Sequence, residues 1–185
     1  MLYTGIRINE ALSLTWDDVD FKSKKISINK TFAYTRKLNS NENYSIQTPK
    51  SKTSKREIPL CNSALELLLA QKNNNTNTKW VFSTRNNTAI RDTTFRKSLR
   101  NLIKILNDEE KECAIKENRN PILFPNITPH SFRHTFATRC FENGVNGKIV
   151  QKYLGHSSMS MTMDLYTHVD EKLMVENIEK IDNLF

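Results

Sequence analysis

Glycine is scarce in this 185-residue chain. It occurs four times, whereas an average usage of roughly 7% would give about thirteen. Glycine supplies the backbone conformations that tight turns and helix ends need. Its scarcity therefore favours a rigid, helix-rich domain, and each of the four positions needs a local reason. These positions are Gly5, Gly144, Gly147 and Gly155.

Cysteine is also rare, and the three residues (Cys61, Cys113 and Cys140) lie far apart. Their number and spacing exclude a closed disulfide framework and a Cys-x-x-Cys metal site, and they fit a reduced cytosol. No apolar run approaches the ~18–20 residues that a membrane span needs. The first residues lack the basic and apolar regions of a signal peptide. We therefore expect a cytoplasmic protein without membrane contact.

The composition that remains suits one globular domain. Hydrophobic residues make up 37% of the chain and aromatic residues 9%. This content can form a core and argues against a disordered chain. We expect a single domain over 1–185.

Positive charge is concentrated in two blocks. The net charge is +8. Residues 22–56 contain ten Lys or Arg and one acid, and residues 72–104 contain eight and one. Such blocks favour a polyanion partner, most simply nucleic acid, although a solvated lysine-rich surface would look the same.

The periodicity predicts a mostly α fold with a small antiparallel β-sheet (α+β). Residues 24–32 alternate with period two and predict a strand, and 43–60 predict a hairpin with a turn near 51–54. Ser63 and Glu66 predict a capping box. Further helices are expected over 4–14, 93–106, 129–142, 149–154, 159–166 and 171–184.

Several polar residues have no obvious place in such a fold. Arg7 follows Gly5 in an apolar helix start, and His130 and Arg133 share one helix face. His156 follows the helix-ending Gly155. Each residue alone has a structural explanation, such as the pairing of Arg7 with an acid three residues later.

Four segments together resemble, in order, the motif boxes of the tyrosine recombinase (phage integrase) family. They surround the family's first arginine, its hairpin lysine, its His-x-x-Arg box and its Leu-Gly-His box with the tyrosine. They read TGIRINEALSLTWDDVDF, TPKSKTSKREIPL, PHSFRHTFAT and YLGHSSMSMTMDLYTH. The resemblance runs from Thr4 to about Val169 and is closest to integrases of phages and integrative mobile elements.

The resemblance implies cutting and rejoining of DNA through a covalent 3′-phosphotyrosine. Arg7 and Arg133 would clamp the phosphate, because guanidiniums bind its oxygens bidentately. Tyr166 would be the nucleophile. His130 would take up or return the tyrosine proton, and His156 would hydrogen-bond a non-bridging oxygen.

The family's lysine, which protonates the 5′-hydroxyl leaving group, has three candidates. Lys50 is favoured by its distance from the REIPL strand, and Lys52 and Lys55 remain open. Lys52, Lys55 and Arg56 are also expected to contact DNA. Glu10 is expected to orient Arg7 or a neighbouring helix.

The resemblance implies double-stranded DNA as partner, a tetramer on DNA, possible accessory DNA-bending proteins, and no metal or other cofactor. The family's N-terminal core-binding domain does not precede Thr4. We therefore expect a catalytic-domain fragment or a natural truncation. The apolar stripe of 171–185 is expected to pack either on a neighbouring protomer or within its own chain.

Three alternatives stay open at this point. A non-enzymatic DNA-binding remnant of an integrase would explain the basic blocks. A metal hydrolase could use His130 and His134 on one helix face, although Ser131 stands where the metalloprotease motif needs Glu. A type IB topoisomerase shares the phosphotyrosine chemistry.

Overall fold

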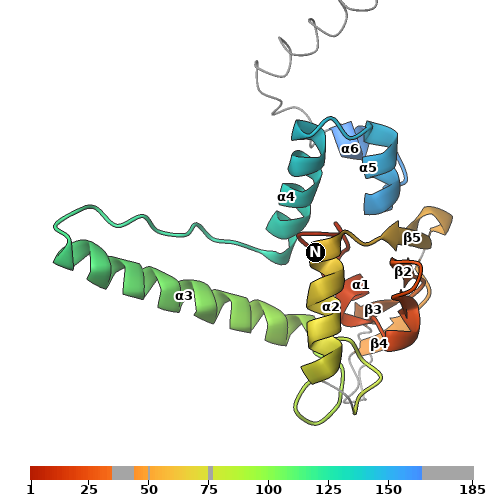
Figure 1. Ribbon diagram of the computed structural model, residues 1–185, viewed down its shortest axis with the longest axis horizontal. Helices are drawn as coiled ribbons and strands as arrows, with labels where there is room; N and C mark the ends of the chain where they lie inside the picture. Colours follow the sequence, from red (N-terminus) through yellow and green to blue (C-terminus); the bar gives the residue numbers. More distant parts are fainter. Residues whose placement is uncertain (35–43, 50, 75–76, 164–185) are drawn as a thin grey trace, which may run out of the picture.

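The computed structural model describes residues 1–34, 44–49, 51–74 and 77–163. The described chain is mostly helical with two small antiparallel sheets (Figure 1), which confirms the predicted fold class. Lys50, Tyr166 and the expected C-terminal helix lie outside the described residues. Among the described residues, no helix has the length and apolarity needed to cross a membrane.

One sheet has three strands and the other has two. The first has the order β1-β2-β5, and the second pairs β3 with β4. The strands are β1 (Val19–Asp20), β2 (Lys25–Ile28), β3 (Thr31–Tyr34), β4 (Tyr44–Gln47) and β5 (Arg56–Pro59). Ile26 lies opposite Ile58, and both side chains are buried.

Two strand predictions are wrong, one in the continuity of the strand and the other in its pairing. The strand expected over 24–32 is divided after Ile28, and the two arms of the expected hairpin join different sheets, β4 with β3 and β5 with β2. Polar contacts to Asp18 lie at this division. The Asn29 amide donates to the Asp18 carboxylate at 2.9 Å, and Lys30 forms an ion pair with the same carboxylate. The expected turn is present as a short 3-10 segment, Lys52–Ser54.

Six α-helices and two 3-10 segments, Trp16–Asp18 and the turn Lys52–Ser54, occur among the described residues. The helices are α1 (Ile8–Leu12), α2 (Asn62–Asn74), α3 (Asp92–Lys116), α4 (Pro129–Glu142), α5 (Gly147–Leu154) and α6 (Ser160–Met163). The bounds of α4 are those predicted, because Thr128 caps its start and Gly144, with φ +71°, follows its end. The prediction of a capping box at Ser63 is wrong, because α2 already begins at Asn62.

Two buried clusters form the core. The larger joins α1 and the start of α2 to the three-stranded sheet, and the smaller lies between α4 and α5. The C-terminal end of α5 meets the start of α1 between these clusters. This junction brings together residues that are about 150 positions apart in the chain.

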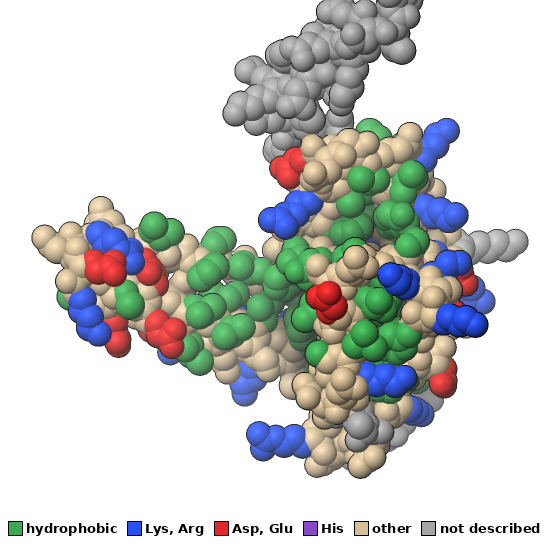
Figure 2. Space-filling view, in the orientation of Figure 1, with side chains coloured by type: hydrophobic (Ala, Val, Ile, Leu, Met, Phe, Trp, Pro, Cys, Tyr) green, Lys and Arg blue, Asp and Glu red, His purple; other side chains and the backbone are tan. Residues whose placement is uncertain are grey.

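Helix α3 extends away from the rest of the molecule, and the segment after it runs back alongside (Figure 1). Asn107 holds the two together, because its side chain donates to and accepts from the backbone of Phe124. Hydrophobic side chains lie along this arm in Figure 2, and Leu102 is 53% exposed. Of the α3 side chains described, only Ala114 is buried, so the apolar side chains of this helix form no core face within the described chain.

Candidate active site

Arg7 is held at the start of α1 by Glu10. The backbone N–H of Arg7 donates to Oε2 of Glu10 at 2.9 Å, and its Nη1 donates to Oε1 at 3.0 Å. The third contact joins Nη2 to the carbonyl oxygen of Gly155 at 3.3 Å. The side chain remains 37% exposed, so this guanidinium is fixed on one side and open to solvent on the other. The expected contact of Glu10 with Arg7 is confirmed.

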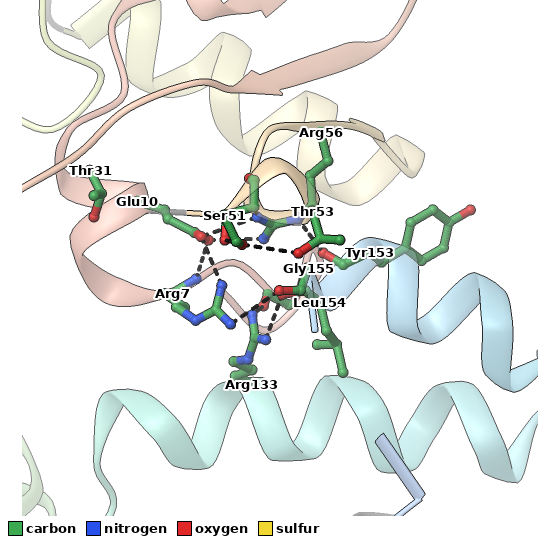
Figure 3. A network of polar contacts seen from close by, with 12 residues as sticks. Arg7, Glu10, Thr31, Ser51, Thr53, Arg56, Arg133, Tyr153, Leu154 and Gly155 are labelled. Carbon is green, nitrogen blue, oxygen red and sulfur yellow. Dashed lines mark hydrogen bonds and ion pairs between the residues drawn. The ribbon is translucent and has the colours of Figure 1, made fainter. Parts of the chain in front are cut away.

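Arg133 rises from α4 and is 3% exposed. Its Nη2 donates to the carbonyl oxygen of Leu154 at 2.6 Å, and its Nη1 donates to the carbonyl oxygen of Gly5. Burial, followed by the positive charge of Arg7, lowers the pKa of Arg133 to about 9. Figure 3 shows Arg7 and Arg133 approaching the end of α5 from different elements, where they bind the carbonyls of adjacent residues.

His156 lies directly beyond this helix end and is 9% exposed. Gly155, with φ +63°, turns the chain so that the imidazole points back into the molecule. Its Nδ1 lies 2.9 Å from Oγ1 of Thr162. Burial, followed by the charges of Arg133 and Arg7, lowers the pKa of His156 to about 4. The ring is therefore neutral at pH 7.

His130 occupies the first turn of α4, one turn before Arg133. Its ring stands edge-on to that of His134, with 4.5 Å between the ring centroids. Burial, then His134 and Arg133, lowers the pKa of His130. An exposed imidazole that is neutral at pH 7 can accept a proton.

Glu10 and Arg56 form a buried ion pair behind the site. Two guanidinium nitrogens of Arg56, Nη1 and Nη2, donate to the Glu10 carboxylate at 3.1 and 2.9 Å. Nε of Arg56 donates to the Tyr153 carbonyl at 2.7 Å, which ties β5 to α5. Figure 3 shows both side chains. They are only 2% and 4% exposed. This pairing does not fit the DNA contact expected for Arg56, because the Glu10 carboxylate occupies both of its Nη groups and neutralises its charge. Lys55 beside it is exposed.

A basic pocket of about 330 Å³ adjoins His156. No carboxylate side chain lines it among the described residues. Its walls are Thr53, Lys55, Arg56, Lys148, Gln151, Lys152, Gly155 and His156. Sequence reasoning missed Lys148 and Lys152, which are four residues apart and share one face of α5. Their i, i+4 spacing opposite the buried Val150 and Leu154 is the signal that could have identified them.

The structure thus brings Arg7, Arg133 and His156 to one point and places His130 on the helix that carries Arg133. Lys50 and Tyr166 lie outside the described residues, and only the backbone is described for Lys52. Across the ranges that the structure describes, no group of three His, Cys, Asp or Glu residues could hold a metal ion.

Comparison with known proteins agrees with this geometry. The sequence model of the Phage integrase family matches residues 1–172. A tyrosine recombinase XerC-like protein of Caldanaerobacter subterraneus is 32% identical over 98% of this chain and 47% of its own length. The transposase of transposon Tn916 from Enterococcus faecalis is 30% identical over 91% of this chain and 40% of its own length. The chain therefore spans about half the length, or less, of these curated relatives.

Solved structures show the same fold. The integrase of transposon Tn1549, in complex with transposon right end DNA, superposes with a TM-score of 0.80 at 26% identity, covering 98% of this chain and 56% of that one. The XerA recombinase shares the fold with a TM-score of 0.59 at 21% identity, covering 97% of this chain and 54% of that one. The family match, together with this fold, confirms the resemblance seen in the four motif boxes. The chain belongs to the phage integrase family, the tyrosine recombinases.

Proposed function

We propose that this chain is the catalytic domain of a site-specific recombinase that cuts and rejoins double-stranded DNA during the integration of a mobile element. The observation that carries the proposal is the convergence of Arg7, Arg133 and His156 at the end of α5. The Tn1549 integrase, which shares the fold, was solved with DNA, and this supports DNA as the substrate.

The two arginines would bind the scissile phosphate. Its transition state concentrates negative charge on the non-bridging oxygens, and fixed guanidiniums stabilise that charge without reorganising. Arg7 is half-open to solvent, so it can meet a phosphate directly. His156 would donate the single N–H of its neutral ring to a non-bridging oxygen. The positive charge in this scheme comes from the protein's own side chains.

Tyr166 would attack the phosphorus atom. Its Oη–P bond forms while the bond from phosphorus to the 5′ oxygen breaks, and the DNA 3′ end stays attached to the enzyme. The tyrosine proton passes to His130. Rejoining reverses each step, with a 5′-hydroxyl of another strand as the attacking group. The phosphodiester energy is retained in the tyrosine ester, so no nucleotide hydrolysis is needed.

A lysine of the segment 48–60 would protonate the departing 5′ oxygen. Lys50 remains our first assignment, and Lys52 and Lys55 are its competitors. We assign DNA backbone contacts to Lys52 and Lys55, and extend them to the basic pocket beside His156. Recombination by this chemistry needs paired DNA sites. We therefore propose a tetramer on DNA, assisted where needed by DNA-bending proteins, in the cytoplasm.

The test uses a pool of nicked suicide duplexes with randomised sequence, because the target site is not encoded in a readable form. The intact chain should form an SDS-resistant protein–DNA adduct, whereas Tyr166→Phe should form none. Tyr3→Phe is the matched control, because Tyr3 is exposed and lies outside the site, and it should react like the unaltered protein. Adducts that persist in Tyr166→Phe would refute the nucleophile assignment.

The same experiment separates the alternatives. DNA binding without any adduct would favour the non-enzymatic remnant, which the basic pocket also supports. Cleavage that leaves no adduct and stops in EDTA would favour a metal hydrolase using His130 and His134. Adduct formation that is unchanged by EDTA is the expected result.

A further inference from the structure

A buried threonine is in contact with the site histidine. Thr162 lies on α6, is 0% exposed, and places its Oγ1 2.9 Å from Nδ1 of His156. It precedes Tyr166 by four residues in the sequence. Thr162 lies within the fourth motif box, but the resemblance assigns it no role in the reaction.

This hydrogen bond can run in two directions. Either the imidazole donates its Nδ1 proton to the threonine oxygen, or the hydroxyl donates to an unprotonated Nδ1. The two cases place the single proton of a neutral ring on opposite nitrogens. Only the second leaves Nε2 protonated and able to donate to a phosphate oxygen.

Burial of the hydroxyl decides between the two directions. If the ring donated to Thr162, the hydroxyl proton would need another acceptor, and the structure assigns none to it within residues 1–34, 44–49, 51–74 and 77–163. A buried donor without a partner is costly, whereas a hydroxyl oxygen that donates its proton and accepts nothing is tolerated better. The ring is neutral because burial, Arg133 and Arg7 lower its pKa, so it carries one N–H.

We propose that Thr162 is a positioning residue whose hydroxyl donates to Nδ1 of His156 and thereby keeps the ring proton on Nε2, facing the phosphate site. The inference rests on the proposed function, in which His156 donates to a non-bridging oxygen. The hydroxyl also fixes the rotation of the ring, because a donor on one edge aligns the opposite edge. Thr162 therefore acts through His156 and does not touch DNA.

The tautomer can be measured without any cleavage assay. Long-range proton–nitrogen NMR spectra of the 15N-labelled chain distinguish protonated from unprotonated imidazole nitrogens, and His156→Gln identifies the signals of His156. We expect a protonated Nε2 and an unprotonated, hydrogen-bonded Nδ1 at pH 7. A protonated Nδ1 in the unaltered protein would overturn the inference without any variant.

Two variants complete the test. Thr162→Val keeps the shape and removes the hydroxyl, so the Nδ1 signal should move to that of a free nitrogen or to an average of two tautomers. Thr162→Ser retains the hydroxyl and should keep the original signal. An Nδ1 signal unchanged in Thr162→Val would overturn the inference. If Thr162→Val does not fold, the unaltered protein and Thr162→Ser still decide it.

Adduct formation provides the functional readout. Thr162→Val should slow adduct formation at saturating DNA about fivefold, the ratio expected for loss of one neutral hydrogen bond. Its affinity for DNA should be unchanged, and Thr162→Ser should recover most of the rate. Equal rates in the Val and Ser variants would refute the positioning role. Failure of the Tyr166→Phe test would instead remove the proposed function and leave the NMR result standing.

Discussion

The buried pair of Glu10 and Arg56 allows a quantitative prediction. Glu10→Gln keeps the size of the side chain but removes its charge and replaces one acceptor oxygen by a donor group. Arg56, which is 2% exposed, then keeps its charge without a counter-ion, and one of its donors faces the new amide. Removing one partner of a buried pair costs about 3–5 kcal/mol, because the other charge stays desolvated. The half-exposed contact to Arg7 adds at most about 1 kcal/mol.

Glu10→Gln should therefore lower the free energy of unfolding by about 4 kcal/mol, measured by urea denaturation followed by circular dichroism. Glu57→Gln is the matched control, since Glu57 forms an exposed pair with Lys25 and should cost less than about 1 kcal/mol. In the double variant Glu10→Gln/Arg56→Met, the loss should be smaller than the sum of the single losses. A loss below about 1 kcal/mol in Glu10→Gln would refute the view that this pair is buried and essential.

The same pair predicts a pH dependence. Burial alone would raise the pKa of Glu10, but the hydrogen bonds and charge of Arg56 outweigh it and hold the pKa below its ordinary value. A carboxylate with a depressed pKa contributes stability that is complete above its unfolded pKa, about 4.3, and is lost as pH falls through the folded value. Glu10→Gln should remove this acid-side loss, and an unchanged acid limb would contradict the assignment.

Three further predictions concern the site's surroundings. Gly155→Val should destabilise the fold by about 1–3 kcal/mol more than Gly144→Val in urea denaturation. Both glycines have positive φ, but only at position 155 would an added Cβ lie 2.8 Å from Nη1 of Arg56. Equal losses would show that the backbone strain of positive φ alone matters. Lys152→Gln should weaken DNA binding and reduce the slope of log affinity against log salt by about 1; Lys111→Gln on the α3 arm should change neither, and equal effects would refute a role for the basic pocket. Lys50→Ala should stop adduct formation with ordinary DNA. It should not stop it with a 5′-bridging phosphorothiolate, because the thiolate leaves without a proton. Normal cleavage of ordinary DNA by this variant would assign the protonation of the leaving group to another lysine.

Features fixed by neighbouring residues could be predicted from the sequence. Helix α4 spans the predicted range 129–142, because the cap at Thr128 and the turn at Gly144 depend on a few adjacent residues. The turn at Gly155 followed from the same reasoning. Such local signals are sufficient to place His130, Arg133 and His156 at their positions along α4 and after α5.

Features that depend on distant residues could not be predicted in this way. A charge at position 56 reads as exposed in the sequence, and its burial depends on a carboxylate 46 residues earlier. The pairing of β3 with β4 requires that the strand expected over 24–32 be divided after Ile28. The contacts of Asn29 and Lys30 with Asp18 lie at this division. Thr162 carries no signal as a single residue, since its contact to His156 appears only when α6 folds back on the turn after α5.

The carbonyl groups at the end of α5 have a thermodynamic consequence for the proposed reaction. Leu154 and Gly155 offer their oxygens to Arg133 and Arg7, at the helix terminus where the peptide dipoles leave partial negative charge. Each arginine side chain carries about 2 kcal/mol of rotamer entropy. That entropy is lost when the chain folds, before DNA arrives. A phosphate entering the site would meet guanidiniums already ordered by backbone oxygens. Its binding free energy would not have to offset the ordering of these two side chains, so more of it would remain to hold the reacting strand.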